Sequence, residues 1–324
     1  ETFGNHPPAL RSAVIPFVFN LYNQGACVRC SARFLCLQEI ALFNLTENEI
    51  ITFYNSLPEV NEDTKITNFP RDFHPCPICL GILQSSPETK ELYYKQQILS
   101  ELENCGHEYK HFQYGITLPF ASIIRDMGCI RALKQQTKDF TLDESCIPSV
   151  KEVFKWISAR FIPVKFKMES EFTISLNFSN PSSENILKCF QPVKQGKSRK
   201  QRFKQKGKQT GPIFMHTIPS LMKQMNDLSS ENIEKFGIYP LTELEKMSDL
   251  QIEFNHTFVY VAGRYNKYSR MLSQTPWIIE GIRKTESSVE ELIAEKIVEI
   301  YHASGFSFSS SGREDIDVRM LGNG

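Results

Sequence analysis

The sequence predicts an α+β fold that is divided between more than one domain. A chain of 324 residues is longer than one hydrophobic core usually organises. Between residues 149 and 178, an apolar helical stripe is followed by a strand-like alternation of apolar and polar residues. Helices and strands that follow one another in this mixed order are typical of an α+β unit.

The composition is that of an ordinary soluble globular protein, with 41% hydrophobic and 23% charged residues. The formal net charge is zero, so nucleic-acid binding would have to depend on local basic patches. The apolar run at residues 13–19 is too short to cross a membrane. Because no signal peptide precedes it, we expect a protein of the nucleus, the cytoplasm or both. The chain opens on Glu1, and we expect it to be part of a longer protein.

Local patterns predict the elements of the first two thirds of the chain. Ser149 and Glu152 form a capping pair at the start of an apolar stripe. Gly106 is a helix stop, Pro119 ends a strand, and Asn180-Pro181 turns the chain after the clearest strand. Helices are expected at residues 31–43, 89–105 and 149–158, and strands at 107–118 and 171–178.

Two short helices are expected next, at residues 220–225 and 229–237, the second ending at Gly237. A strand or hairpin should open the C-terminal domain near Leu250. Its expected apolar face consists of Ile252, Phe254, Phe258, Tyr260 and Ala262.

The clearest helix of the chain begins at Ser287 or Ser288. Ser287 with Glu290, or Ser288 with Glu291, makes a capping box, and Gly305 should end the helix. A short strand is expected at residues 306–309. The expected buried stripe of the helix consists of Val289, Leu292, Ile293, Ile297 and Ile300.

Two Cys-x-x-Cys pairs, Cys27 with Cys30 and Cys76 with Cys79, predict a structural zinc site. Each pair can place two thiolates on one ion, and two pairs complete a tetrahedral site. The nine cysteines are unevenly spaced, which argues against a disulfide scaffold. Unrelated reduced cysteines and a redox pair are the alternatives. Cys36 and His74 lie close enough in sequence to replace a ligand.

Residues 194–208 contain eight Lys or Arg and no acidic residue. Such a tract cannot bury a core, and its charges repel one another, so we expect an extended or disordered segment. Contact with RNA phosphates, a nuclear localisation signal and a solvated linker remain open as interpretations.

A second basic segment mixes cations with aromatic rings. Arg264, Lys267 and Arg270 alternate with Tyr265 and Tyr268. Cations can reach phosphates while aromatic faces stack on unpaired bases, so this pattern favours contact with looped or single-stranded RNA. An exposed basic loop without a ligand is the alternative.

The last fifteen residues contain Gly312-Arg313-Glu314-Asp315, in which a carboxylate lies between cationic and glycine neighbours. From the residues alone, this is either a polar surface loop or a site where Asp315 acts as nucleophile or base. The run from Gly312 to Gly322 resembles the catalytic signature of pseudouridine synthases, and most closely the archaeal and eukaryotic family called pseudouridine synthase ten. The resemblance implies that Asp315 is catalytic and that Arg313 and Gly312 belong to the substrate site.

The resemblance extends in order through the chain, and the segments around Cys76 and residues 260–279 also match the family. It implies a zinc-knuckle region at 1–88, a THUMP-like RNA-binding region at 89–249 and the incomplete start of a catalytic domain at 250–324. The substrate-binding set would be Gly312, Arg313, Arg264, Tyr265, Lys267 and Arg270.

The implied reaction is the isomerisation of uridine to pseudouridine in tRNA, at uridines 54 and 55 of the TΨC arm, after the base has been flipped out. No organic cofactor is expected beside the structural zinc. We expect the protein to be a monomer that binds tRNA and does not associate with a membrane. The 324 residues alone should be inactive. The alternatives are a non-catalytic RNA-binding adaptor and a zinc-dependent scaffold.

Overall fold

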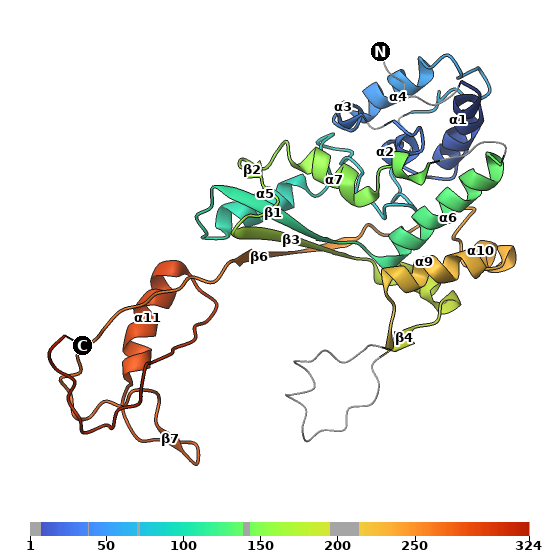
Figure 1. Cartoon of the computed structure of the whole chain (residues 1–324). Helices are drawn as coiled ribbons and strands as arrows, with labels where there is room; N and C mark the ends of the chain where they lie inside the picture. The colour runs from blue at the N-terminus through green and yellow to red at the C-terminus, as the bar shows by residue number, and fades with distance from the viewer. Residues whose placement is uncertain (1–7, 38, 70–71, 139–142, 195–213, 324) are drawn as a thin grey trace. The chain divides into compact units, whose positions relative to one another are not determined.

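The computed structural model describes residues 8–37, 39–69, 72–138, 143–194 and 214–323 (Figure 1). The chain forms two compact units. The larger unit comprises Glu1–Leu102 and His111–Asn255, and the smaller comprises Glu103–Lys110 and His256–Gly324. Both helices and strands are present in each, so the expected α+β class is confirmed at this level.

A four-stranded sheet forms the centre of the larger unit. The strand order is β2 (Lys165–Phe166), β1 (His111–Thr117), β3 (Phe172–Ser179) and β6 (Asp249–His256). β1 is parallel to both β2 and β3, with Tyr114 opposite Ile174. The alternation that predicted β3 is confirmed, because Phe172, Ile174, Leu176 and Phe178 are all buried.

Parallel neighbours need a long crossover connection, and two helices supply it between β1 and β3. They are α6 (Phe120–Gln136) and α7 (Val150–Ser158). The predicted capping pair is confirmed, because Ser149 and Glu152 form a complete capping box on α7. α7 packs on the sheet, with the rings of Phe154 and Phe178 5.4 Å apart. The sequence patterns did not predict α6.

A second apolar core lies where α6 meets η2 (Pro181–Cys189), α9 (Ile218–Asp227) and α10 (Ser230–Lys235). α9 and α10 confirm the two helices predicted for this part of the chain, and Gly237 follows α10 with a left-handed φ of +60°. This core contains Leu80, Ala121, Ile124, Ile186, Phe190, Leu221, Met225, Ile233 and Ile238.

Helices dominate the N-terminal part of the larger unit. They are α1 (Pro8–Asn23), α2 (Val28–Arg33), α3 (Ile40–Phe43) and α4 (Glu47–Asn55). The single helix predicted at 31–43 was wrong, because the backbone of Cys36 adopts a φ of +58° that no α-helix can contain. α5 (Lys95–Asn104) confirms only the second part of the helix predicted at 89–105. Among the described helices, none is long and apolar enough to cross a membrane.

A buried ion pair joins α2 to α6. Both Nη2–carboxylate contacts between Arg33 and Asp126 are short, at 2.7 and 2.8 Å, and the Arg33 side chain has no exposed surface. Burial is the largest single influence and would lower the pKa of Arg33, but the charges and hydrogen bonds of Asp126 and Cys30 together outweigh it and raise that pKa. The pair therefore holds two elements together that are 93 residues apart.

We expect Asp126→Asn to lower the free energy of unfolding by about 3 kcal/mol, because it leaves a buried guanidinium without its counter-charge. The exposed pair of Lys134 and Glu144 offers a matched control, and Glu144→Gln should cost no more than about 1 kcal/mol. Urea unfolding followed by circular dichroism measures both. Equal destabilisation by the two variants would contradict the importance assigned to burial.

The smaller unit contains the hairpin β7 (Ile278–Ile279) with β8 (Ile282–Arg283) and the helix α11 (Val289–Tyr301). Of the two predicted capping boxes, Ser288 with Glu291 provides the cap. The helix ends at His302, whose φ of +47° is left-handed, and not at Gly305. Residues 306–309 do not form the predicted strand.

The apolar stripe of α11 is only partly covered by the described residues. Val289 and Ala294 are buried, whereas Leu292 is 52% and Ile300 is 70% exposed. Leu292 and Ile300 were predicted to be buried and are not. Phe258 and Tyr260 are also exposed, at 87% and 89%.

Apart from residues 103–110, the expected regions 1–88 and 89–249 lie in one compact unit, and the strand expected to open the C-terminal domain begins in the same unit. β6 completes the sheet beside β3, where the rings of Phe254 and Phe172 stack at 5.8 Å. The hydroxyl of Tyr94 also donates to the Ser248 carbonyl at 2.6 Å. Pairing with the sheet therefore draws the chain up to Asn255 into the larger unit, and the predicted continuation of the strand through Ala262 was wrong.

Candidate functional sites

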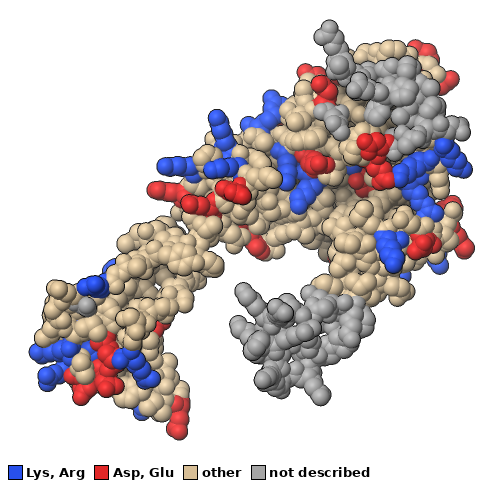
Figure 2. Space-filling view, viewed as in Figure 1, with Lys and Arg blue, Asp and Glu red and all other residues tan. Residues whose placement is uncertain are grey.

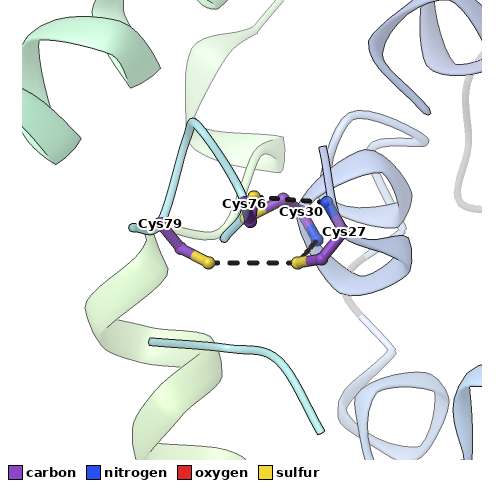
Figure 3. A group of neighbouring side chains, drawn as sticks. All are labelled: Cys27, Cys30, Cys76 and Cys79. Atoms are coloured by element: carbon purple, nitrogen blue, oxygen red, sulfur yellow. Dashed lines mark hydrogen bonds between the residues drawn. The ribbon is translucent and has the colours of Figure 1, made fainter. Parts of the chain in front are cut away.

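The first candidate site is the cysteine cluster, formed by Cys27, Cys30, Cys76 and Cys79 (Figure 3). Their sulfur atoms all lie within 4.8 Å of one another, and all four residues are buried. Cys27 is the N-cap of α2, which places Cys30 one helical turn later on the same side. The chain between Cys76 and Cys79 is a tight turn, in which the Leu80 amide donates to the Cys76 carbonyl at 2.8 Å.

Backbone amides are directed at three of these sulfurs. The Cys27 amide donates to Cys76 Sγ at 3.2 Å, the Cys30 amide to Cys27 Sγ at 3.4 Å and the Leu83 amide to Cys79 Sγ at 3.3 Å. Such donors favour the thiolate form of a sulfur over the thiol. The sulfurs of Cys27 and Cys79 are 3.9 Å apart, close to the roughly 3.8 Å that tetrahedral ligands at 2.3 Å from one zinc ion would have.

Burial raises the pKa of Cys27 and Cys30. Burial would also raise that of Cys76, but hydrogen bonds from the other three cysteines outweigh it and lower its pKa. Four thiolates buried together would require a compensating cation. The four residues therefore fit a metal ion, and the cluster could hold one.

Two buried guanidinium groups lie beside the cluster. Arg33 interacts electrostatically with Cys30, and Arg125 with Cys76. Arg125 is fixed by its hydrogen bonds to the carbonyl of Pro77, at 2.9 Å, and the hydroxyl of Thr242, at 3.0 Å. Four thiolates around a divalent cation carry a net charge of −2, so two adjacent cations complement the charge of a loaded site.

The second candidate site is the Asp315 loop, residues 312–320 of the smaller unit. Asp315 and Arg313 are exposed. Among the residues that the structure describes, neither side chain has a hydrogen-bond or ion-pair partner. An exposed carboxylate without a partner is free to meet a substrate, and the local Arg–Asp pair considered from the sequence is not formed.

The loop is held by the segment at residues 264–274, called here the anchoring segment. Lys267 Nζ donates to the carbonyls of Asp315 and Ile316, and Gln274 Nε2 donates to the carbonyl of Gly312 at 3.0 Å. The Tyr265 hydroxyl bonds to the carboxylate of Glu314. Side chains from one segment therefore contact the loop on both sides of Asp315.

The anchoring segment is itself tied to the N-terminus of α11. The amides of Val289 and Glu290 donate to the carbonyls of Ser273 and Gln274, both at 2.9 Å. The hydroxyls of Ser273 and Thr285 are also 2.9 Å apart. The capped helix, the anchoring segment and the Asp315 loop are therefore connected by hydrogen bonds through the smaller unit.

The residues predicted to bind RNA do not all face outward. Arg264 and Arg270 are exposed, as is Tyr268, whereas Lys267 is 2% exposed and Tyr265 is half-buried. Exposure alternates from Arg264 to Tyr268, as it does where successive side chains point to opposite sides of the backbone. The ammonium group of Lys267 donates hydrogen bonds to backbone carbonyl oxygens. It is therefore not the exposed, unpaired cation that the sequence pattern suggested.

The basic tract 194–208 lies, apart from the backbone of Lys194, outside the described residues. On the face shown in Figure 2, Lys and Arg side chains are interspersed with Asp and Glu. Local clusters of cations, rather than an overall field, must therefore supply any attraction to RNA on this face.

Comparison with known families covers both units. The family described as "Eukaryotic Pus10, N-terminal" matches residues 76–251, and "Pus10, C-terminal" matches residues 260–324. The first match alone covers more than half of the chain. The chain belongs to the Pus10 family. The resemblance expected from the Gly312–Gly322 signature is thereby confirmed.

Curated Pus10 relatives match over most of the chain. The tRNA pseudouridine synthase Pus10 of Xenopus laevis is 31% identical over an alignment 345 residues long, which covers 94% of this chain and 63% of the relative. The human protein of the same name is 30% identical, over 94% of this chain and 64% of its own length. An archaeal relative, from Thermofilum pendens, is 47% identical over 74 residues. The chain spans just under two thirds of the length of these Xenopus and human relatives.

Sequence reasoning missed the anchoring role of Gln274 and the two guanidiniums beside the cysteine cluster. Gln274 lies in the segment that resembles the family, but no local pattern around a single glutamine indicates that it holds a distant loop. Arg33 follows Cys30 by three residues in α2, and this spacing was a local signal that could have indicated it. Arg125 lies far from both cysteine pairs in the sequence, and only folding brings it close. The spacing of Cys27, Cys30, Cys76 and Cys79, in contrast, predicted a cluster that the structure confirms as a possible metal site.

Proposed function

We propose that the protein acts in the isomerisation of uridine to pseudouridine in tRNA, with Asp315 as the catalytic residue. The observation that carries the proposal is the unpartnered, exposed carboxylate of Asp315 on a loop that hydrogen bonds hold on both sides. The name of the Xenopus and human relatives, tRNA pseudouridine synthase Pus10, supports the same reaction and substrate.

The reaction breaks the bond between uracil N1 and ribose C1′, rotates the base and joins C1′ to uracil C5. C5 loses its hydrogen as a proton and N1 gains one, so no oxidant, reductant or organic cofactor is needed. Asp315 acts on the ribose or the base during this exchange. A stacked uridine cannot reach a loop carboxylate, so the base must first be flipped out. The exposed Arg313 is suited to hold the displaced backbone.

The test is release of tritium from tRNA labelled at uridine C5. It compares the 324-residue chain with a longer protein that includes any coding sequence after Gly324. We propose that only the longer protein is active. Leu292 and Ile300 of α11 are exposed, so the apolar side of this helix is not covered by the residues of the 324-residue chain that the structure describes. Substrates without uridine at position 54 or 55 then test the TΨC-arm assignment. If the longer protein binds RNA but releases no tritium, the alternative function of a non-catalytic RNA-binding adaptor would be favoured.

We also propose that the ion in the cysteine cluster is zinc and that its role is structural. Four cysteine ligands are typical of structural zinc, whereas catalytic zinc keeps one position open. The buried position of all four residues supports a closed site. We further propose that the sheet region within 89–249 is the THUMP-like RNA-binding part. We also propose that the protein is a monomer.

For RNA binding, we expect the logarithm of the association constant to fall with the logarithm of salt concentration by about 0.7 to 0.9 per phosphate contact. Arg270→Met should remove one such contact, because Arg270 is exposed in the anchoring segment. Deletion of 195–208 should flatten the slope further. Filter binding of tRNA at several salt concentrations measures both changes, and an unchanged slope in both variants would contradict phosphate contact by these residues.

A further inference from the structure

We propose that Lys267 is a positioning residue, whose ammonium group sets the backbone of the Asp315 loop and does not contact RNA. This deepens, and rests on, the proposed role of Asp315 in catalysis. Lys267 belongs to a segment rich in cations, and sequence alone places it in the same class as Arg264 and Arg270. Three observations separate it from those two residues.

The first observation is burial. The Lys267 side chain is among the most deeply buried large side chains described, with 2% of its surface exposed, whereas Arg264 and Arg270 are exposed. An ammonium group that is removed from water needs partners for all of its donors. Phosphate contact would require the group to leave that position.

The second observation is the set of partners. Nζ donates to three carbonyl oxygens: that of Asp315 at 2.8 Å, Ile316 at 3.2 Å and Leu272 at 3.2 Å. A lysine has three N–H donors, so these three acceptors account for its capacity. Two of the three belong to the proposed catalytic residue and its neighbour. The ammonium therefore fixes the peptide groups on which the Asp315 side chain is mounted.

The third observation is a backbone bridge at the same residue. The Lys267 amide donates to the Met320 carbonyl, and the Met320 amide donates to the Lys267 carbonyl, both at 2.9 Å. Lys267 thus contacts the loop through its backbone at one end and through its side chain near Asp315. Because Lys267 holds the loop at two separate points, it restrains both the position and the orientation of the backbone between them.

Replacement of the ammonium by a methyl group removes the side-chain bonds and leaves the bridge. In Lys267→Met, the carbonyls of Asp315 and Ile316 lose a donor, and the loop is free to move relative to the anchoring segment. A displacement of about 1 Å at a catalytic group can cost on the order of 10²-fold in rate. We therefore expect kcat to fall by that factor while the affinity for tRNA stays the same.

The first test uses the 324-residue chain and needs no activity. Acetylation of amines followed by mass spectrometry should modify the exposed Lys284 at least tenfold faster than Lys267. Hydrogen exchange at Val318, whose amide donates to the Asp315 carbonyl, should be at least tenfold faster in Lys267→Met than in the parent chain. Arg270→Met, a matched loss of an exposed cation from the same segment, should leave exchange unchanged. Equal acetylation of Lys267 and Lys284, or unchanged exchange in Lys267→Met, would overturn the proposal.

The second test uses the longer protein with labelled tRNA. Lys267→Met should lower kcat on the order of 10²-fold without changing the salt slope of binding, whereas Arg270→Met should reduce that slope. A reduced slope in Lys267→Met would show phosphate contact and overturn the proposal. If no variant releases tritium, the proposed reaction fails, but acetylation and exchange still decide whether Lys267 holds the loop.

Discussion

Asp315→Asn is expected to reduce tritium release from uridine-labelled tRNA by a factor on the order of 10⁴, the upper range for removing one acid or base. An amide is neither a nucleophile nor a base, yet it has nearly the same shape as the carboxylate. Asp315 is exposed, and its backbone, not its side chain, forms the bonds to Lys267. The substitution should therefore leave the loop and the tRNA affinity unchanged.

Two neighbouring carboxylates serve as controls for this assignment. The Glu314 carboxylate bonds to the Tyr265 hydroxyl, so it faces the anchoring segment and is not available to a substrate. Asp317 is exposed like Asp315 and is the stronger rival. Asp317→Asn should retain activity within a factor of about ten of the parent, because Asp317 lies outside the Gly-Arg-x-Asp core. Full activity in Asp315→Asn, or complete loss only in Asp317→Asn, would overturn the assignment of Asp315.

Cys76→Ser is expected to release the bound metal and to unfold the N-terminal part of the larger unit. Binding of structural zinc supplies folding free energy directly, about 10 to 16 kcal/mol in small zinc domains, so the loss should exceed the stability of most single domains. Cys76 also accepts a hydrogen bond from the Cys27 amide at 3.2 Å and therefore links the two cysteine pairs. Metal analysis should give one zinc per parent chain and none in the variant.

Cys105→Ser is the matched control, because Cys105 lies outside the cysteine cluster and is only half-buried. It should bind one zinc and unfold at the parent temperature. A chelator added to the parent chain should reproduce the effect of Cys76→Ser. Purified parent protein without metal, or a Cys76→Ser variant with unchanged metal content and unfolding temperature, would contradict a structural zinc site.

Features that depend on neighbours within a few residues were predictable from the sequence. The caps of α7 at Ser149 and of α11 at Ser288 follow this rule, because a cap is formed by groups three residues apart. The burial alternation of β3 is also local, since it reflects the period of a strand. The Cys-x-x-Cys spacing places two sulfurs on one side of a turn in the same way.

Pairings between distant segments could not be predicted in this way. Nothing near Cys36 in the sequence indicates the left-handed φ that ends the helix expected at 31–43. The assignment of β6 to the larger unit depends on its position beside β3, more than 70 residues earlier in the chain. Such choices are made by the packing of a whole sheet, whose free energy no local window contains.

The two candidate sites show the same division. The sequence determined which residues carry the chemistry: four thiols, one aspartate in a Gly-Arg-x-Asp core, and a segment rich in cations. Tertiary structure decided that the four sulfurs lie within 4.8 Å of one another and that Arg125 lies beside them. It also decided that Lys267 points inward to the Asp315 loop while Arg264 and Arg270 face solvent. The physical reason is that residue type fixes charge and donor capacity, whereas burial and partners exist only once distant segments have packed together.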